Sequence, residues 1–169
     1  MSDPTLPAYQ ALLYAIVRGT NAKLVYEIGV RQGFSTRAIL EALSKTGGRL
    51  VSCDIVDCQA AIQDDALLRR WTFYQTNSKR FVSLLTIPAD VVYIDGSHEY
   101  ADVRADVVGM WPLLKVGGVM ILHDTLSFPD GPGRVLTWLQ HRGVEAVNLP
   151  FHNGFGVVHK TQERGLQEV

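Results

Sequence analysis

Short apolar runs alternate with amphipathic stretches along most of the chain. The apolar runs predict strands at 24–28, 50–54, 71–74, 89–95 and 119–123. Between them, apolar residues recur at the spacing of a helix face. This spacing predicts helices at 7–18, 35–44, 60–70, 78–85, 100–111 and 134–140. The alternation indicates an open α/β sheet, and the almost continuously apolar run at 89–95 is typical of a strand buried on both faces.

The chain closes with two apolar runs that no helix separates. They lie at 145–149 and 155–159, with a turn at Asn153 and Gly154 between them. The connection is too short for a crossover helix, so these runs are expected to pair as an antiparallel hairpin. A dehydrogenase half would continue with parallel strands instead.

Length and charge limit the class of protein. A chain of 169 residues predicts a single domain over 1–169, with an N-terminal helix within 1–22 and a polar tail at 161–169. With 16 basic and 17 acidic residues it lacks the charge excess of proteins that bind nucleic acid or anionic membranes, so a small-molecule partner is expected. The longest apolar run, 11–17, is too short to span a bilayer, and no signal peptide is evident. The expected location is cytoplasmic, with Cys53 and Cys58 as reduced structural thiols.

The end of the first predicted strand carries the first chemical signal. Glu27 is followed by Gly29 and Gly33, and a helix begins at Ser35. Glycines at a strand-to-helix turn let the backbone approach a ligand closely. The spacing differs from the Gly-x-Gly-x-x-Gly dinucleotide fingerprint. It resembles motif I of the class I S-adenosylmethionine-dependent methyltransferases.

A second acidic residue follows about one βαβ unit later. Asp54 ends the second strand, where a carboxylate can accept hydrogen bonds from both ribose hydroxyls of an adenosine, and Ile55 can pack on the adenine. The resemblance implies that Asn77 and Ser78 meet the adenine edge and that the glycines line the methionine part. The alternative is that Gly29 and Gly33 form an ordinary tight turn and Asp54 begins a loop.

The ends of the fourth and fifth strands carry the other chemical group. The segments Asp95-Gly96-Ser97-His98 and Gly117 to Asp124 resemble those of small-molecule O-methyltransferases. These are the catechol and caffeoyl-coenzyme A type and the bacterial relatives that modify antibiotic sugars and cephalosporins, in methyltransferase family 24. The resemblance implies that Asp95, His123 and Asp124 hold a divalent metal, Mg or Mn. It also implies that His98 is the catalytic base, acting beside Asp95, which also borders the cofactor.

The chemistry of methyl transfer explains why a base and a cation would be needed at these positions. Methyl transfer from a sulfonium needs an acceptor oxygen that has lost its proton, and hydroxyl groups are mostly neutral at pH 7. A histidine can remove that proton, and a cation bound to the oxygen favours its loss. The alternatives are that Asp95 caps the following helix, that Asp124 caps a turn with Thr125, and that His98 only hydrogen-bonds to the site. His123 stands where catechol-type enzymes have an oxygen ligand, and imidazole suits manganese better than magnesium. His152 is expected to face solvent.

The resemblance implies a Rossmann-like three-layer sandwich with a seven-stranded, mostly parallel sheet of order 3-2-1-4-5-7-6 and an antiparallel last strand. The implied activity is S-adenosylmethionine-dependent, metal-assisted O-methylation of a small molecule or sugar. Two alternatives remain: a catalytically silent cofactor-binding partner subunit and a metal-dependent hydrolase. The chain has a shorter N-terminal region than catechol-type enzymes, so the site is either open or covered by the partner subunit of a homodimer. The loop at 126–133 is the chain's own candidate for substrate contact.

Overall fold

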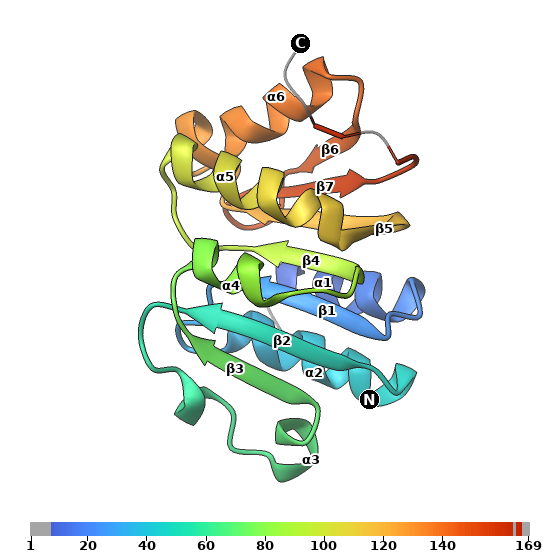
Figure 1. Cartoon of the computed structure of the whole chain (residues 1–169), viewed down its shortest axis with the longest axis vertical. Coiled ribbons are helices and arrows are strands. Elements are labelled where there is room, and N and C mark those ends of the chain that lie inside the picture. Colours follow the sequence, from blue (N-terminus) through green and yellow to red (C-terminus); the bar gives the residue numbers. More distant parts are fainter. Residues whose placement is uncertain (1–7, 164, 167–169) are drawn as a thin grey trace.

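A single twisted sheet organises the computed structural model, which describes residues 8–163 and 165–166 (Figure 1). The strands of these residues stand in the order β3-β2-β1-β4-β5-β7-β6. Their bounds are β1 Leu24–Ile28, β2 Arg49–Asp54, β3 Trp71–Gln75, β4 Ala89–Ile94, β5 Leu114–His123, β6 Glu145–Leu149 and β7 Phe155–His159. The first five strands are parallel, and β7 runs antiparallel to both β5 and β6. The predicted strand order and closing hairpin are confirmed.

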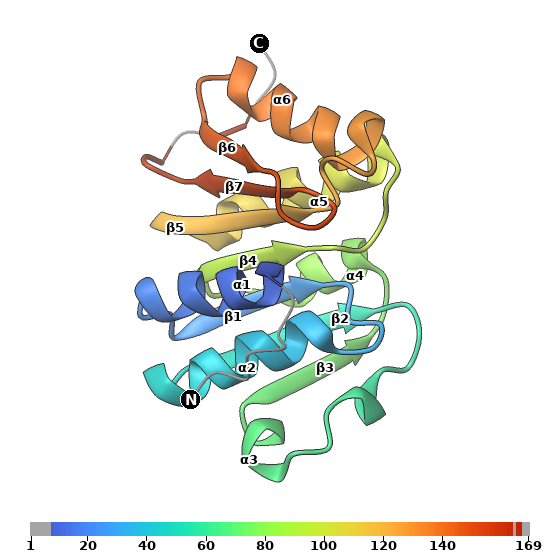
Figure 2. The ribbon, with the colours of Figure 1, turned by 180° about the vertical axis from the view of Figure 1, so that it is seen from behind.

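Helices cover both faces of the sheet. On one face lie α1 Ala8–Gly19, α2 Phe34–Thr46 and the short α3 Asp65–Leu68, and on the other α4 Ser78–Leu84, α5 Tyr100–Met110 and α6 Arg134–His141 (Figures 1 and 2). Each face has its own apolar core. Leu13, Leu40 and Leu43 pack in the first, and Phe81, Met110 and Leu139 in the second. This is the predicted three-layer sandwich.

The burial of the central strands explains their continuous apolar sequences. All five residues of β1 are buried, and β4 is buried at every position except Asp90. A strand covered by helices on both faces needs apolar side chains on both, so its sequence is a continuous apolar run instead of an alternating one. Glu27 is the exception within β1, and its environment is described below.

Two predicted boundaries were wrong. The region 60–70 forms only a 3₁₀ turn, Gln59–Ala61, and the single turn α3, because the Asp64 carboxylate accepts hydrogen bonds from the N–H groups of Ala66 and Leu67 and so fixes a late start. Strand β5 starts at Leu114, not at 119, because Leu114 already pairs with Ala89 before extra residues in β5 shift its register with β4. Two further turns, Trp111–Leu113 and Pro129–Gly133, precede β5 and α6.

The arrowheads of β1 to β4 all point to the left edge of the molecule in Figure 1. The residues that end these strands therefore share one edge of the sheet, which is where open α/β sheets bind ligands. Among the described residues, no helix has the length and apolar character needed to cross a membrane.

Candidate functional site

Gly29 lies where three strand ends come together. Its N–H donates to the carbonyl of Cys53, and the neighbouring Ile28 carbonyl accepts from the N–H of Asp95. Its φ is 92°, and a Cβ on Gly29 would overlap the carbonyl oxygen of Asp95. Only glycine fits both the conformation and the space. Gly33, with φ 77°, ends the same turn immediately before α2 and packs on Ala61.

Glu27 stabilises this turn through contacts with the residues that flank it. Its carboxyl group is fully buried and accepts hydrogen bonds from the hydroxyls of Ser35 (2.7 Å), Thr36 (2.9 Å) and Ser52 (2.7 Å). Burial raises the pKa of Glu27 to about 7, although the three hydroxyls oppose the shift. Glu27 thereby ties β1 to the start of α2 and to β2, and it positions the turn instead of facing the cavity described next.

Asp54 also stabilises this turn, through hydrogen bonds from its backbone. Its Oδ2 accepts from the N–H groups of Val30 (2.9 Å) and Arg31 (3.0 Å), and its Oδ1 from that of Val56 (3.1 Å). Burial disfavours the ionised carboxylate, but these hydrogen bonds outweigh it and lower the pKa of Asp54. Asp54 is therefore a fixed anion at the end of β2.

A cavity of about 1040 Å³ extends along the carboxyl ends of β4, β1, β2 and β3 and beneath α4 and α5. It is large enough for a nucleotide-sized ligand. Six of the residues predicted to bind the cofactor line it: Gly29, Asp54, Ile55, Asn77, Ser78 and Asp95. Glu27, Gly33 and Ser35 are not among its lining residues. Asp106 of α5 also lines the wall, although no sequence signal pointed to it.

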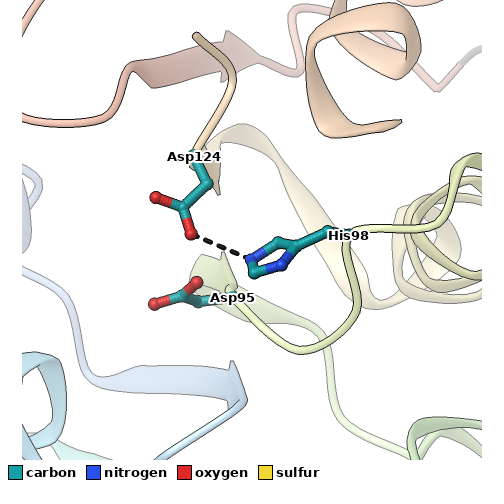
Figure 3. Close-up of side chains that lie close together, drawn as sticks. All are labelled: Asp95, His98 and Asp124. Atoms are coloured by element: carbon teal, nitrogen blue, oxygen red, sulfur yellow. Dashed lines mark hydrogen bonds and ion pairs between the residues drawn. The ribbon is translucent and has the colours of Figure 1, made fainter. Parts of the chain in front are cut away.

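Asp95, His98 and Asp124 point toward one another at one end of this cavity (Figure 3). Each offers one oxygen or nitrogen, and these three atoms lie within 4.8 Å of one another. The Nε2 atom of His98 is 2.9 Å from Oδ2 of Asp124. Asp124 adopts a φ of 59°, an uncommon conformation outside glycine that turns its side chain back from the end of β5. Two strand ends and the loop after β4 thus build one polar cluster.

His123 also contacts this cluster. Its Nδ1 lies 3.1 Å from Oδ1 of Asp124 and 3.5 Å from Oδ1 of Asp95. Burial lowers the pKa of His123, but the two carboxylates outweigh burial and raise this pKa to about 9. Burial raises the pKa of Asp124, but other contacts, chiefly the one with His123, outweigh burial and lower this pKa to about 2. Within the described residues, both ring nitrogens of His123 and Oδ1 of Asp124 are buried without a well-aligned hydrogen bond. Of these atoms, the carboxylate oxygen of Asp124 can serve a bound cation, whereas the His123 ring must first lose its proton.

Two aromatic residues hold the cluster in place. The hydroxyl of Tyr93, which is fully buried, donates to Oδ2 of Asp95 at 3.2 Å, and burial raises its pKa so that it stays a donor. The ring of Phe128 stacks on His98 with centroids 3.8 Å apart and planes 9° apart. Tyr93 stands two residues before Asp95, on the same side of the strand, so strand alternation could have identified it. The stacking of Phe128 had no sequence signal, although its loop was a candidate for substrate contact.

The prediction for His152 was incomplete. It is exposed, as expected, but its ring lies 5.8 Å from that of His123 and 5.0 Å from that of Tyr9 of α1. Tyr9 itself lies 5.0 Å from His123. With Phe128, which stacks on His98, rings from three separate segments therefore border the polar cluster.

Comparisons with known proteins agree with the fold. A family model described as methyltransferase domain matches residues 26–125. Three similar solved structures are cofactor-bound Rv0187 from MTB (TM-score 0.81, 19% identity), an O-methyltransferase from Bacillus cereus with S-adenosylhomocysteine (0.76, 20%) and the O-methyltransferase TomG from Streptomyces achromogenes with S-adenosylmethionine (0.75, 19%). They cover 94%, 95% and 94% of this chain, which covers 85%, 84% and 83% of theirs.

A curated relative has no known role. The uncharacterized protein y4gI of Sinorhizobium fredii is 24% identical over an alignment of 161 positions, which covers 85% of this chain. The chain spans only 18% of the length of that relative.

Proposed function

This chain belongs to the methyltransferase domain family, and we propose that it transfers the methyl group of S-adenosylmethionine to a hydroxyl group of a small molecule. One observation carries the proposal: Asp95 belongs both to the wall of the large cavity and to the cluster with His98 and Asp124. A cofactor in the cavity therefore has its reactive end beside a candidate base. The glycine turn and the fixed Asp54 carboxylate suit the methionine part and the ribose of the cofactor.

In the proposed reaction, His98 takes the proton of the acceptor hydroxyl. The Nε2–H group of its neutral ring donates to Asp124, so the Nδ1 lone pair accepts the proton, and Asp124 stabilises the imidazolium that forms. The acceptor oxygen attacks the methyl carbon in line with the carbon–sulfur bond. That bond breaks with its electron pair on sulfur, and S-adenosylhomocysteine leaves. Holding the two reactants in line supplies much of the rate.

The cluster also fits a divalent metal ion. Two carboxylates and an imidazole are suitable donors for Mn²⁺, and Oδ1 of Asp124 is a buried acceptor without a well-aligned donor among the described residues. Asp95 and Asp124 would hold the ion. The third donor would be a ring nitrogen of either His98 or His123, the ligand that the sequence resemblance implies. A bound ion would make the acceptor hydroxyl more acidic and orient it. If His98 is the third donor, it cannot also be the base, so His98→Gln would weaken metal binding as well as activity.

The acceptor is proposed to lie over the cluster, against the rings of Tyr9, Phe128 and His152. Tyr9 of α1 and His152 of the β6–β7 turn lie against His123, and Phe128 of the loop after β5 stacks on His98. Phe128 is 41% exposed, so it has surface left for a ligand. The partner expected from this environment is a small hydroxylated molecule.

Calorimetric titration of the metal-stripped protein with S-adenosylmethionine and with NAD tests the cofactor. We expect stoichiometric binding of S-adenosylmethionine alone, lost in Asp54→Ala and kept in Glu145→Gln, which removes an exposed carboxylate on β6. Titrations with Mg²⁺ and Mn²⁺, in the wild type, His98→Gln and His123→Gln, then identify the third metal donor. Absence of S-adenosylmethionine binding under all these conditions would overturn the proposal.

Screening hydroxylated acceptors for S-adenosylhomocysteine release tests the activity itself. Transfer to an acceptor that His98→Gln abolishes is the expected result. Tight cofactor binding with no transfer to any hydroxylated compound would instead identify a silent cofactor-binding subunit.

A further inference from the structure

Asp106 is a buried carboxyl group that the proposed reaction does not use. It lies on α5, is 5% exposed and lines the large cavity together with Asp102, Ala105 and Gly109 of the same helix. These four residues follow one another at helical spacing, so they form a single stripe facing the cavity. A carboxyl group placed in such a wall is costly unless something hydrogen-bonds to it.

The Ser78 hydroxyl supplies one hydrogen bond to Asp106. Burial nevertheless dominates and raises the pKa of Asp106 to about 6, with the nearby carboxylate of Asp102 adding to the rise. The groups that act on Asp106 thus include a hydroxyl and a like charge, and the arrangement favours a ligand that brings a further hydrogen-bond donor.

The order of the strands identifies which part of a cofactor meets this group. The cavity runs across the ends of β4, β1, β2 and β3, a distance of roughly 14 Å at about 4.8 Å between strands. The reactive end must lie at Asp95, after β4, because His98 and Asp124 are there. Ser78 follows β3 at the opposite end, and Asp106 is hydrogen-bonded to it.

The surroundings of Ser78 suit a flat, mostly apolar ring. The side chain of Ile55 is 73% exposed on the rim of the cavity, and Val82 of α4 and Gly109 of α5 line it as well. A Cβ on Gly109 would meet Val82 at 3.3 Å, so the glycine keeps these helices close. Apolar walls that end in a half-buried hydroxyl and a buried carboxyl group are typical of a site that recognises the polar edge of a base.

We propose that Asp106 makes the cavity selective for adenine, by accepting a hydrogen bond from the exocyclic amino group of the base. This inference rests on the proposed cofactor role of the cavity. A base with an oxo group at the same position, such as hypoxanthine or guanine, would place an oxygen against the carboxylate of Asp106. It would lose the hydrogen bond and gain a repulsion, and a buried polar group that is left unpaired discriminates strongly.

Calorimetry with two ligands tests this inference. S-Adenosylhomocysteine carries an amino group at this position, and S-inosylhomocysteine carries an oxygen there together with a proton on the adjacent ring nitrogen, so the two ligands differ only along this edge of the base. We expect the wild type to bind the adenine form at least about tenfold more tightly. In Asp106→Asn the amide can either accept from an amino group or donate to an oxo group, so the ratio should fall to within about threefold. The control Glu145→Gln should keep the wild-type ratio.

The outcomes separate this inference from the proposed function. Equal affinity of the wild type for both ligands, or an unchanged ratio in Asp106→Asn, would overturn the role of Asp106 while leaving the cofactor proposal intact. Failure of the wild type to bind either ligand would overturn the proposed function itself. Circular dichroism of Asp106→Asn checks that the fold is retained, and equal affinity of the wild type for both ligands would overturn the inference even if this variant does not fold.

Discussion

His98 and Asp124 form a hydrogen-bonded pair, with 2.9 Å between Nε2 and Oδ2, although one follows β4 and the other ends β5. If this pair is the base, His98→Gln should lower kcat by roughly 10²- to 10⁴-fold with little change in cofactor affinity. Asp124→Asn should lower it as well, because the ring loses its orienting partner. The double variant should be little worse than His98→Gln, since the two residues act as a unit.

Steady-state rates measured from about pH 6 to 9 check this pair. The acidic limb of the wild-type profile should disappear in His98→Gln, because a general base acts only while it is unprotonated. Glu99→Gln is the matched control, because Glu99 is an exposed neighbour of His98 whose side chain makes no capping hydrogen bond. Strictly additive effects of His98→Gln and Asp124→Asn would argue that they act separately.

Phe128 should matter for turnover more than for cofactor binding. Its ring stacks on His98 and does not line the cofactor cavity. Loss of an aromatic stack is worth about 0.5–1.5 kcal/mol, so Phe128→Ala should lower kcat by up to about tenfold and leave the Kd for S-adenosylmethionine unchanged. Leu84→Ala, at an apolar side chain that is also 41% exposed but lies at the end of α4, should change neither quantity. A weakened Kd in Phe128→Ala would show that the stack serves the cofactor instead.

Gly29 and Gly47 form a matched pair for testing the strand-to-helix turn. Both have positive φ, 92° and 77°, but a Cβ on Gly47 meets nothing within 4 Å, whereas one on Gly29 overlaps the Asp95 carbonyl. Gly47→Ala should cost about 1 kcal/mol of unfolding free energy from conformation alone. Gly29→Ala should cost clearly more and also weaken S-adenosylmethionine binding. Urea unfolding and calorimetry measure the two effects, and similar costs at both positions would contradict the close packing at Gly29.

Glu27 should make stability fall as pH rises. Its folded pKa is about 7 against an ordinary value of 4.5, so between these values the folded state holds a proton that the unfolded state has released. The unfolding free energy therefore decreases as pH rises through this range and levels off above the folded pKa. Asp106, with a folded pKa of about 6, acts in the same direction.

Glu27→Gln cannot lose that proton, so it should flatten the decline without removing the part due to Asp106. Urea unfolding at several pH values between about 5 and 8 measures the slope, with Glu145→Gln as a control at an exposed carboxylate. The same slope in Glu27→Gln as in the wild type would contradict the assignment.

The family, the strand order and the residues that end the strands could be predicted from the chain. Continuous apolar runs indicated strands buried on both faces, and the resemblance at Glu27 to Gly33 and at Asp95 to His98 supplied the strand order. Local signals sufficed because parallel strands place their last residues at one edge of the sheet. The same reasoning failed at 60–70, where helical spacing is weak and the Asp64 cap decides where the helix starts.

The sequence by itself determined which residues stand at the strand ends: Gly29, Asp54, Asp95 and Asp124. Only the tertiary structure decided what each of them contacts. It turned Glu27 toward three hydroxyls instead of the cavity, joined His98 to Asp124, stacked Phe128 on His98 and brought Asp106 to Ser78. Such contacts depend on how separate elements pack and on left-handed backbone conformations such as that of Asp124, and neither follows from local spacing along the chain.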